Sequence, residues 1–135
     1  SGMDVANYGT LFATIADVDK EKALPLIRRF YNLGFNIEGT KGTAEFLRQN
    51  GIRTRYRAKL SEGSDEIFTA LRQGHINYVI NTMDISQGDS TRDGYEIRRC
   101  AVENNVSIFT SLETVQVLLD VLEEITLGVS TIDAE

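Results

Sequence analysis

At residues 35–44 the chain reads Phe35-Asn36-Ile37-Glu38-Gly39-Thr40-Lys41-Gly42-Thr43-Ala44, a short apolar run followed by a turn rich in glycine and threonine. The segment after it, up to Gln49, has the character of a helix. A strand that leads directly into a helix leaves the first N–H groups of the helix unpaired, and such turns bind anions. Glycine lets the backbone approach a ligand closely, and the hydroxyls of Thr40 and Thr43 add donors. We therefore predict a turn that fits a phosphate; the structural alternative is that Thr40 only caps the helix.

Three other loops also place small polar or basic residues directly after an apolar run. They lie at residues 14–20, 59–61 and 81–82. If the apolar runs are parallel strands, these loops all follow the carboxyl ends of strands, where open α/β sheets bind their ligands. We expect the four loops to meet at one edge of a sheet.

Strand and helix patterns alternate along the chain. Apolar runs suited to buried strands lie at residues 11–16, 35–38, 54–58, 77–81 and 106–109. Helical patterns follow them, up to about residue 32 and then at residues 43–50, 64–73, 92–104 and 112–126. This alternation predicts a three-layer α/β domain of the Rossmann-like or flavodoxin-like type, with a five-stranded parallel sheet covered on both faces.

Local signals mark several ends of these helices. Glycines follow three of them, at Gly34, Gly51 and Gly74, and Ser111 precedes the last one as an N-cap. Asp17 or Asp19 is predicted to cap the first helix. Pro25 fits that helix poorly, so we expect a looser first turn at residues 20–24 or a bend. Residues 84–90 are predicted to form a polar loop.

The composition is that of one globular domain of 135 residues. A net charge of −6 argues against a general nucleic-acid-binding surface. Cys100 is the only cysteine, which excludes an internal disulfide and fits a reducing, cytoplasmic compartment. No signal peptide or membrane segment is evident. We interpret residues 1–8 as a tag scar and linker, residues 9–126 as the domain and residues 127–135 as a C-terminal tail.

Several spaced motifs occur together in one order. They are Asp17-Val18-Asp19-Lys20, Gly34-Phe35 with Thr40-Lys41-Gly42-Thr43-Ala44, Lys59-Leu60-Ser61-Glu62-Gly63, Ile80-Asn81-Thr82 and Ile97-Arg98-Arg99. Over almost the whole chain this order resembles the methylglyoxal-synthase-like domain. Within that family the motifs are most similar to the C-terminal allosteric domain of carbamoyl-phosphate synthetase large chains.

The resemblance implies a non-catalytic regulatory domain that binds a phosphorylated nucleotide effector, either UMP, IMP or phosphoribosyl pyrophosphate. The parent chain would be a glutamine-hydrolysing carbamoyl-phosphate synthase, a ligase of pyrimidine and arginine synthesis that uses ATP with Mg or Mn. This domain itself would need no cofactor. The implied partners are the neighbouring synthetase domains, the glutaminase small chain through the parent, and further copies of the large chain, with neither nucleic acid nor membrane.

Carried over to this sequence, the resemblance also implies a set of site residues. The effector phosphate falls to Thr14, Lys20, Thr40, Lys41, Gly42, Thr43 and Lys59. The nucleoside side falls to Asn81, Thr82 and Asp93. Thr110 falls at an ornithine or interdomain contact, and no catalytic residue or metal ligand is implied. Met83, where some members have a second threonine, and a long loop at residues 84–93 leave the base and ribose contacts open.

The rival interpretation is an enzyme, methylglyoxal synthase, which eliminates phosphate from dihydroxyacetone phosphate. That chemistry needs a carboxylate base near the third loop and a histidine near the fourth. Asp65 lies near the first position, but residues 82–99 contain no histidine, and His75 is interpreted as a surface turn residue. Two further alternatives are an IMP cyclohydrolase, whose usual pattern is not evident, and a module that binds only a protein partner. The latter would leave the hydroxyls and lysines of the sheet edge unexplained.

Overall fold

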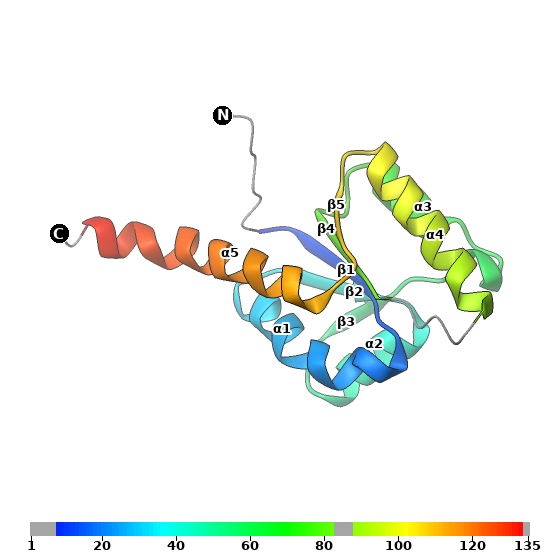
Figure 1. Ribbon diagram of the computed structural model, residues 1–135, viewed down its shortest axis with the longest axis horizontal. Coiled ribbons are helices and arrows are strands. Elements are labelled where there is room, and N and C mark those ends of the chain that lie inside the picture. Colours follow the sequence, from blue (N-terminus) through cyan, green and yellow to red (C-terminus); the bar gives the residue numbers. More distant parts are fainter. Residues whose placement is uncertain (1–7, 83–87, 134–135) are drawn as a thin grey trace.

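Five parallel strands form the centre of the molecule, in the spatial order β3-β2-β1-β4-β5 (Figure 1). The computed structural model describes residues 8–82 and 88–133. The strands are β1 (Thr10–Thr14), β2 (Asn36–Gly39), β3 (Thr54–Tyr56), β4 (Tyr78–Asn81) and β5 (Ser107–Phe109). Each neighbouring pair is parallel, so the predicted five-stranded parallel sheet is confirmed.

Helices cover both faces of this sheet. They are α1 (Lys20–Asn32), α2 (Lys41–Gln49), α3 (Glu66–Arg72), α4 (Gly88–Glu103) and α5 (Leu112–Asp133). One apolar core joins the sheet to α1, α2 and α5, and a second joins it to α3 and α4. Figure 1 shows these two groups of helices on opposite sides of the strands. The arrangement confirms the predicted three layers.

The central strand β1 shows why the sequence folds in this way. Leu11 and Ala13 belong to the core with α1 and α5, whereas Phe12 between them belongs to the core with α3 and α4. All three side chains are fully buried. A strand buried on both faces requires apolar residues at successive positions, which explains the continuous apolar run of the sequence.

The start of the first helix differs from the prediction. A short 3-10 turn, η1 (Asp17–Asp19), precedes α1, so the looser turn lies before Lys20 and not at residues 20–24. Pro25 lies inside α1. Asp19 occupies the N-cap position without a side-chain capping bond, and the carboxylate of Asp17 pairs instead with Lys20. Asp19 therefore takes the predicted N-cap position, but neither aspartate caps the helix through its side chain.

The last two helices are longer than predicted. Helix α4 begins at Gly88, so residues 88–90 of the predicted polar loop are helical; residues 83–87, including Met83 and Asp84, lie outside the described residues. Helix α5 begins after Ser111, whose hydroxyl accepts the Thr114 N–H at 3.3 Å as predicted. It continues to Asp133 and not to residue 126, because no proline interrupts it and each added residue extends an existing helix. The predicted tail is thus helical up to residue 133.

Candidate functional site

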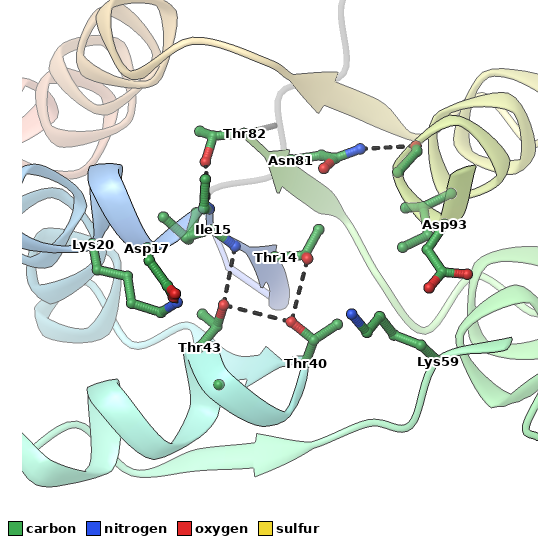
Figure 2. A pocket seen from close by; sticks show the side chains of 14 residues that line it. Thr14, Ile15, Asp17, Lys20, Thr40, Thr43, Lys59, Asn81, Thr82 and Asp93 are labelled. Atoms are coloured by element: carbon green, nitrogen blue, oxygen red, sulfur yellow. Dashed lines mark hydrogen bonds and ion pairs between the residues drawn. The ribbon is translucent and has the colours of Figure 1, made fainter. Parts of the chain in front are cut away.

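A cavity of about 180 Å³ lies at the carboxyl ends of β1, β2 and β4 (Figure 2). It is lined by Thr14, Ile15, Ala16, Asp17, Lys20, Thr40, Gly42, Thr43, Lys59, Asn81, Thr82, Asp93, Gly94 and Ile97. The four loops that the sequence singles out therefore do meet at one edge. From β1 the chain adds β2 and β3 on one side of the sheet and then β4 and β5 on the other side. Doubly wound sheets bind their ligands at such a change of direction.

The amino end of α2 opens into this cavity. The first N–H groups of a helix have no partner within it, and the N–H groups of Lys41, Gly42 and Thr43 find no acceptor elsewhere in the described part of the chain. Gly42 lines the cavity, and a Cβ added to it would lie 3.7 Å from the Lys20 Nζ, which is ordinary contact. These N–H groups are therefore free to bind an anion.

Gly39 has a different role from the one predicted for it. A Cβ at this position would lie 3.1 Å from the Ala13 carbonyl oxygen and 3.4 Å from the Ala44 backbone nitrogen. Both are main-chain atoms that cannot move aside. Gly39 is required for the close approach of β2 to β1 and α2, and it does not line the cavity.

The threonine hydroxyls form a network inside the protein. The Thr43 hydroxyl accepts the Ile15 N–H at 3.0 Å, and the Thr40 hydroxyl bonds those of Thr14 at 3.2 Å and Thr43 at 3.5 Å. Thr40 occupies the N-cap position of α2, but its side chain makes no capping bond. Thr40 thus stands at the predicted cap position, but its hydroxyl belongs to the network, which ties the β1 loop to the turn before α2.

The end of β4 is held in a similar way. Thr82 accepts the Ala16 N–H at 2.9 Å, and Asn81 donates to the Gly94 carbonyl at 2.9 Å. Both side chains are buried. The floor of the cavity is thus linked to the β1 loop on one side and to α4 on the other, and its shape is set by hydrogen bonds between distant parts of the chain.

Two lysines and two aspartates face this cavity. The Lys20 side chain, 14% exposed, forms an ion pair with Asp17, which is 78% exposed. Figure 2 shows Lys20 and Asp17 beside Thr43, whereas Lys59 approaches Thr40 from the other side and Asp93 lies across from Lys59. The two ammonium groups flank the start of α2, and their charge is balanced by the carboxylates.

The loop that carries Lys59 is held by Glu62, within the 3-10 turn η2 (Leu60–Glu62). Glu62 accepts the Lys59 N–H at 2.9 Å and the Tyr56 hydroxyl at 2.7 Å. These two bonds, followed by the charges of Lys59 and Lys41, lower the pKa of Glu62. The carboxylate therefore stays ionised, and holds this turn, to a lower pH than an ordinary glutamate would.

Two of the predicted site residues lie outside the cavity. Lys41 is exposed and does not line it. Thr110 lies in a separate groove between the starts of α1 and α5, to which Lys22, Ser111 and Gln116 also contribute. Thr82 lines both the cavity and this groove.

Five lining residues were not predicted as site residues: Ile15, Ala16, Asp17, Gly94 and Ile97. Asp17 had a usable signal, since its position three residues before Lys20 favours an ion pair across one helical turn. The other four residues carry no chemical signal in the sequence.

The residues considered for enzymatic chemistry lie elsewhere. Asp65 is exposed at the N-cap position of α3 and does not line the cavity. His75, the only histidine of the chain, follows α3 at the amino end of β4, which is the opposite edge of the sheet. Burial is the main cause that raises the pKa of Cys100, which packs in the core with α3 and α4.

Residues 8–82 and 88–133, which the structure describes, contain neither a membrane-spanning helix nor a cluster of metal-binding side chains. No helix there is long and apolar enough to cross a membrane. No three or more histidine, cysteine, aspartate or glutamate side chains are grouped so that they could hold a metal ion.

Fold and cavity together define a doubly wound α/β domain with a polar cavity at the switch point of its sheet. A family model described as MGS-like domain matches residues 22–110, about two thirds of the chain. The chain therefore belongs to the methylglyoxal-synthase-like (MGS-like) domain family. Thr14 and Lys20 of the cavity precede the matched span.

Proposed function

We propose that this domain is the regulatory domain of a carbamoyl-phosphate synthetase large chain and binds a phosphorylated nucleotide, with UMP, IMP and phosphoribosyl pyrophosphate as candidates. One observation carries the proposal: the free N–H groups of α2 and the ammonium groups of Lys20 and Lys59 meet in one cavity. A helix start supplies directed donors and partial positive charge, and lysines add full charges.

The phosphate would bind at the start of α2. Gly42 presents no side chain there, so phosphate oxygens can approach the backbone, with Lys20 and Lys59 on either side. The hydroxyls of Thr40 and Thr43 are already engaged with Thr14 and Ile15, so their first role is to hold the turn in shape.

The rest of the ligand would extend toward α4. Asp93 offers a carboxylate that accepts hydrogen bonds from ribose hydroxyls, and Ile97 offers an apolar surface for a base. A ligand with a phosphate at one end and hydroxyls near its middle matches this order of groups.

Regulation would arise if the nucleotide binds two arrangements of the parent enzyme with different affinity. The positions of two groups of cavity residues support such a link. Asp93 and Gly94 lie in the amino-terminal half of α4, and Thr82 lines both the cavity and the groove that contains Thr110. We propose that ligand binding changes how these elements pack against a neighbouring synthetase domain.

Methylglyoxal synthase is the second candidate, since Asp17 and Asp93 place two carboxylates in the cavity. The position of Asp65 outside the cavity and of His75 at the opposite edge favours the regulatory domain, because the elimination needs a histidine beside the phosphate site.

Calorimetric titration of the 135-residue chain with UMP, IMP and phosphoribosyl pyrophosphate tests the proposal. We expect saturable binding of at least one ligand, with about tenfold weaker binding in Lys59→Ala because a phosphate contact is lost. Lys22→Ala, which removes the same charge from α1 outside the cavity, should bind like the wild type. Lys59 is a better probe than Thr43, whose removal would also leave the Ile15 N–H unpaired.

A parallel assay measures methylglyoxal release from dihydroxyacetone phosphate. Turnover would contradict the regulatory function and identify the chain as a methylglyoxal synthase. Absence of both binding and turnover would reject the nucleotide site in this chain.

A further inference from the structure

The candidate phosphate site contains a carboxylate that already forms an ion pair with one of its two lysines. Asp17 pairs with the Lys20 ammonium, and its side chain makes no other hydrogen bond or ion pair in the described part of the chain. The Lys20 side chain is 14% exposed and lies beside the start of α2, whereas the Asp17 side chain is 78% exposed. The less exposed partner is thus the cation that a phosphate would need, and the more exposed partner is the anion that would compete with it.

The other charges of the cavity do not remove this competition. Lys59 lies on the far side of Thr40, and Asp93 faces the cavity from α4 (Figure 2). The lining residues carry two positive and two negative side chains, so the site has no excess of positive charge. An entering phosphate must share Lys20 with Asp17, and each further negative charge on the ligand is repelled by two carboxylates.

We propose that Asp17 is a specificity-determining residue, a built-in counter-ion of Lys20 that lowers the affinity of the site and selects ligands with one phosphate over ligands with two. This inference rests on the proposed function, because it assumes that the cavity binds nucleotide phosphate, and among the proposed ligands it favours UMP and IMP over phosphoribosyl pyrophosphate. It assigns to Asp17 a role in ligand choice that capping of α1 does not provide, since Asp17 makes no capping bond.

The structure makes Asp17→Asn a clean test. The substitution keeps the shape of the side chain and the backbone of η1, in which the Lys20 N–H bonds the Asp17 carbonyl. The exposed Glu21, in the first turn of α1 and outside the cavity, provides the matched control Glu21→Gln, which changes the net charge equally.

The experiment titrates the wild type, Asp17→Asn and Glu21→Gln with UMP and with UDP at low and high salt. We expect Asp17→Asn to bind UMP about three- to fivefold more tightly, the range of an exposed charge pair. The gain should be larger for UDP, because its additional charge is no longer repelled, and both gains should shrink at high salt. Glu21→Gln should bind both ligands like the wild type.

The other outcomes separate this inference from the proposed function. Wild-type binding of UMP with no gain in Asp17→Asn, or with a loss, overturns the role of Asp17 and leaves the nucleotide site in place. If Asp17→Asn gains affinity for UMP but gains no more for UDP, the proposed selection by charge is overturned. The same holds if neither the wild type nor Asp17→Asn binds UDP. No binding of UMP by any of the three proteins overturns this inference, and the nucleotide site falls with it only if IMP and phosphoribosyl pyrophosphate also fail to bind the wild type.

Discussion

At the scale of single residues, the cavity separates groups that build the fold from groups that remain free for a ligand. Thr43 and Asn81 are buried and bonded to the backbone of other elements, so their side chains are structural before they are functional. Among the described residues, no buried side-chain nitrogen or oxygen lacks a hydrogen-bond partner. The groups left for a ligand are the N–H groups of α2 and the charged side chains at the rim.

The two glycines of the turn allow these roles to be tested apart. Gly39→Ala would press a methyl group against main-chain atoms of Ala13 and Ala44, so we expect a loss of about 1–3 kcal/mol in the free energy of unfolding. Gly42→Ala meets only the Lys20 ammonium at 3.7 Å, so its stability should be unchanged or higher by up to about 1 kcal/mol. Its nucleotide binding should nevertheless weaken, because the methyl group enters the cavity.

Urea unfolding and calorimetric titration of both variants provide the measurements. Loss of stability in Gly42→Ala, or unchanged nucleotide binding by it, would contradict this assignment.

At the scale of elements, α1 and α5 are joined by ion pairs that lie beside their shared apolar core. Arg29 on α1 bonds Glu123 at 2.6 and 2.9 Å and Asp120 at 2.9 Å, both on α5. The Arg29 hydrogen bond is the main cause that lowers the pKa of Glu123, and the two carboxylates raise that of Arg29. This contact fixes α5 before the helix runs on past the body of the domain in Figure 1.

The contact predicts a pH dependence of stability. Because the pKa of Glu123 is lower in the folded state, its contribution is present above the unfolded pKa and is lost as the pH falls through the folded one. We expect Glu123→Gln to cost about 0.5–1 kcal/mol at neutral pH and nothing at a pH below both values, since the pair is partly exposed. Urea unfolding across this range measures the difference, with the exposed Glu124→Gln as control. A constant difference at all pH values would contradict the assignment.

At the scale of the whole molecule, a buried ion pair joins the neighbouring strands β2 and β3 on one side of the sheet. Arg57, just after β3, bonds Glu38 of β2, and both side chains are 9% exposed; Glu66 at the start of α3 lies 3.7 Å away. The chain crosses from one face of the sheet to the other between Arg57 and Glu66, and Lys59 lies on this crossover. The pair therefore positions a cavity residue as well as two strands.

This pair predicts strong coupling. Arg57→Met leaves the Glu38 carboxylate buried and unpaired, so we expect a loss of about 3–5 kcal/mol in the free energy of unfolding. The double variant Glu38→Met with Arg57→Met should recover most of this loss, because no charge then remains buried. Unfolding of the wild type, both single variants and the double variant completes the cycle. Additive effects would show that the two side chains act independently.

Much of the fold was predictable because its signals are local. Buried parallel strands require continuous apolar runs, as at Phe12, and helices begin at caps such as Ser111. The lengths of α4 and α5 were underestimated. The polar residues at the start of α4, from Gly88, and the residues of α5 beyond 126 do not differ from loops in composition.

The sequence by itself determined the order of the elements, the parallel sheet and the edge at which the four loops meet, because the carboxyl ends of parallel strands share one edge. Only the tertiary structure decided which side chains of those loops face the cavity. It placed Asp17 inside and Lys41 and Asp65 outside, and it engaged the hydroxyls of Thr40 and Thr43 within the protein. The physical reason is that these placements depend on packing and hydrogen bonds between residues far apart in the chain, such as Thr43 with Ile15 and Thr82 with Ala16.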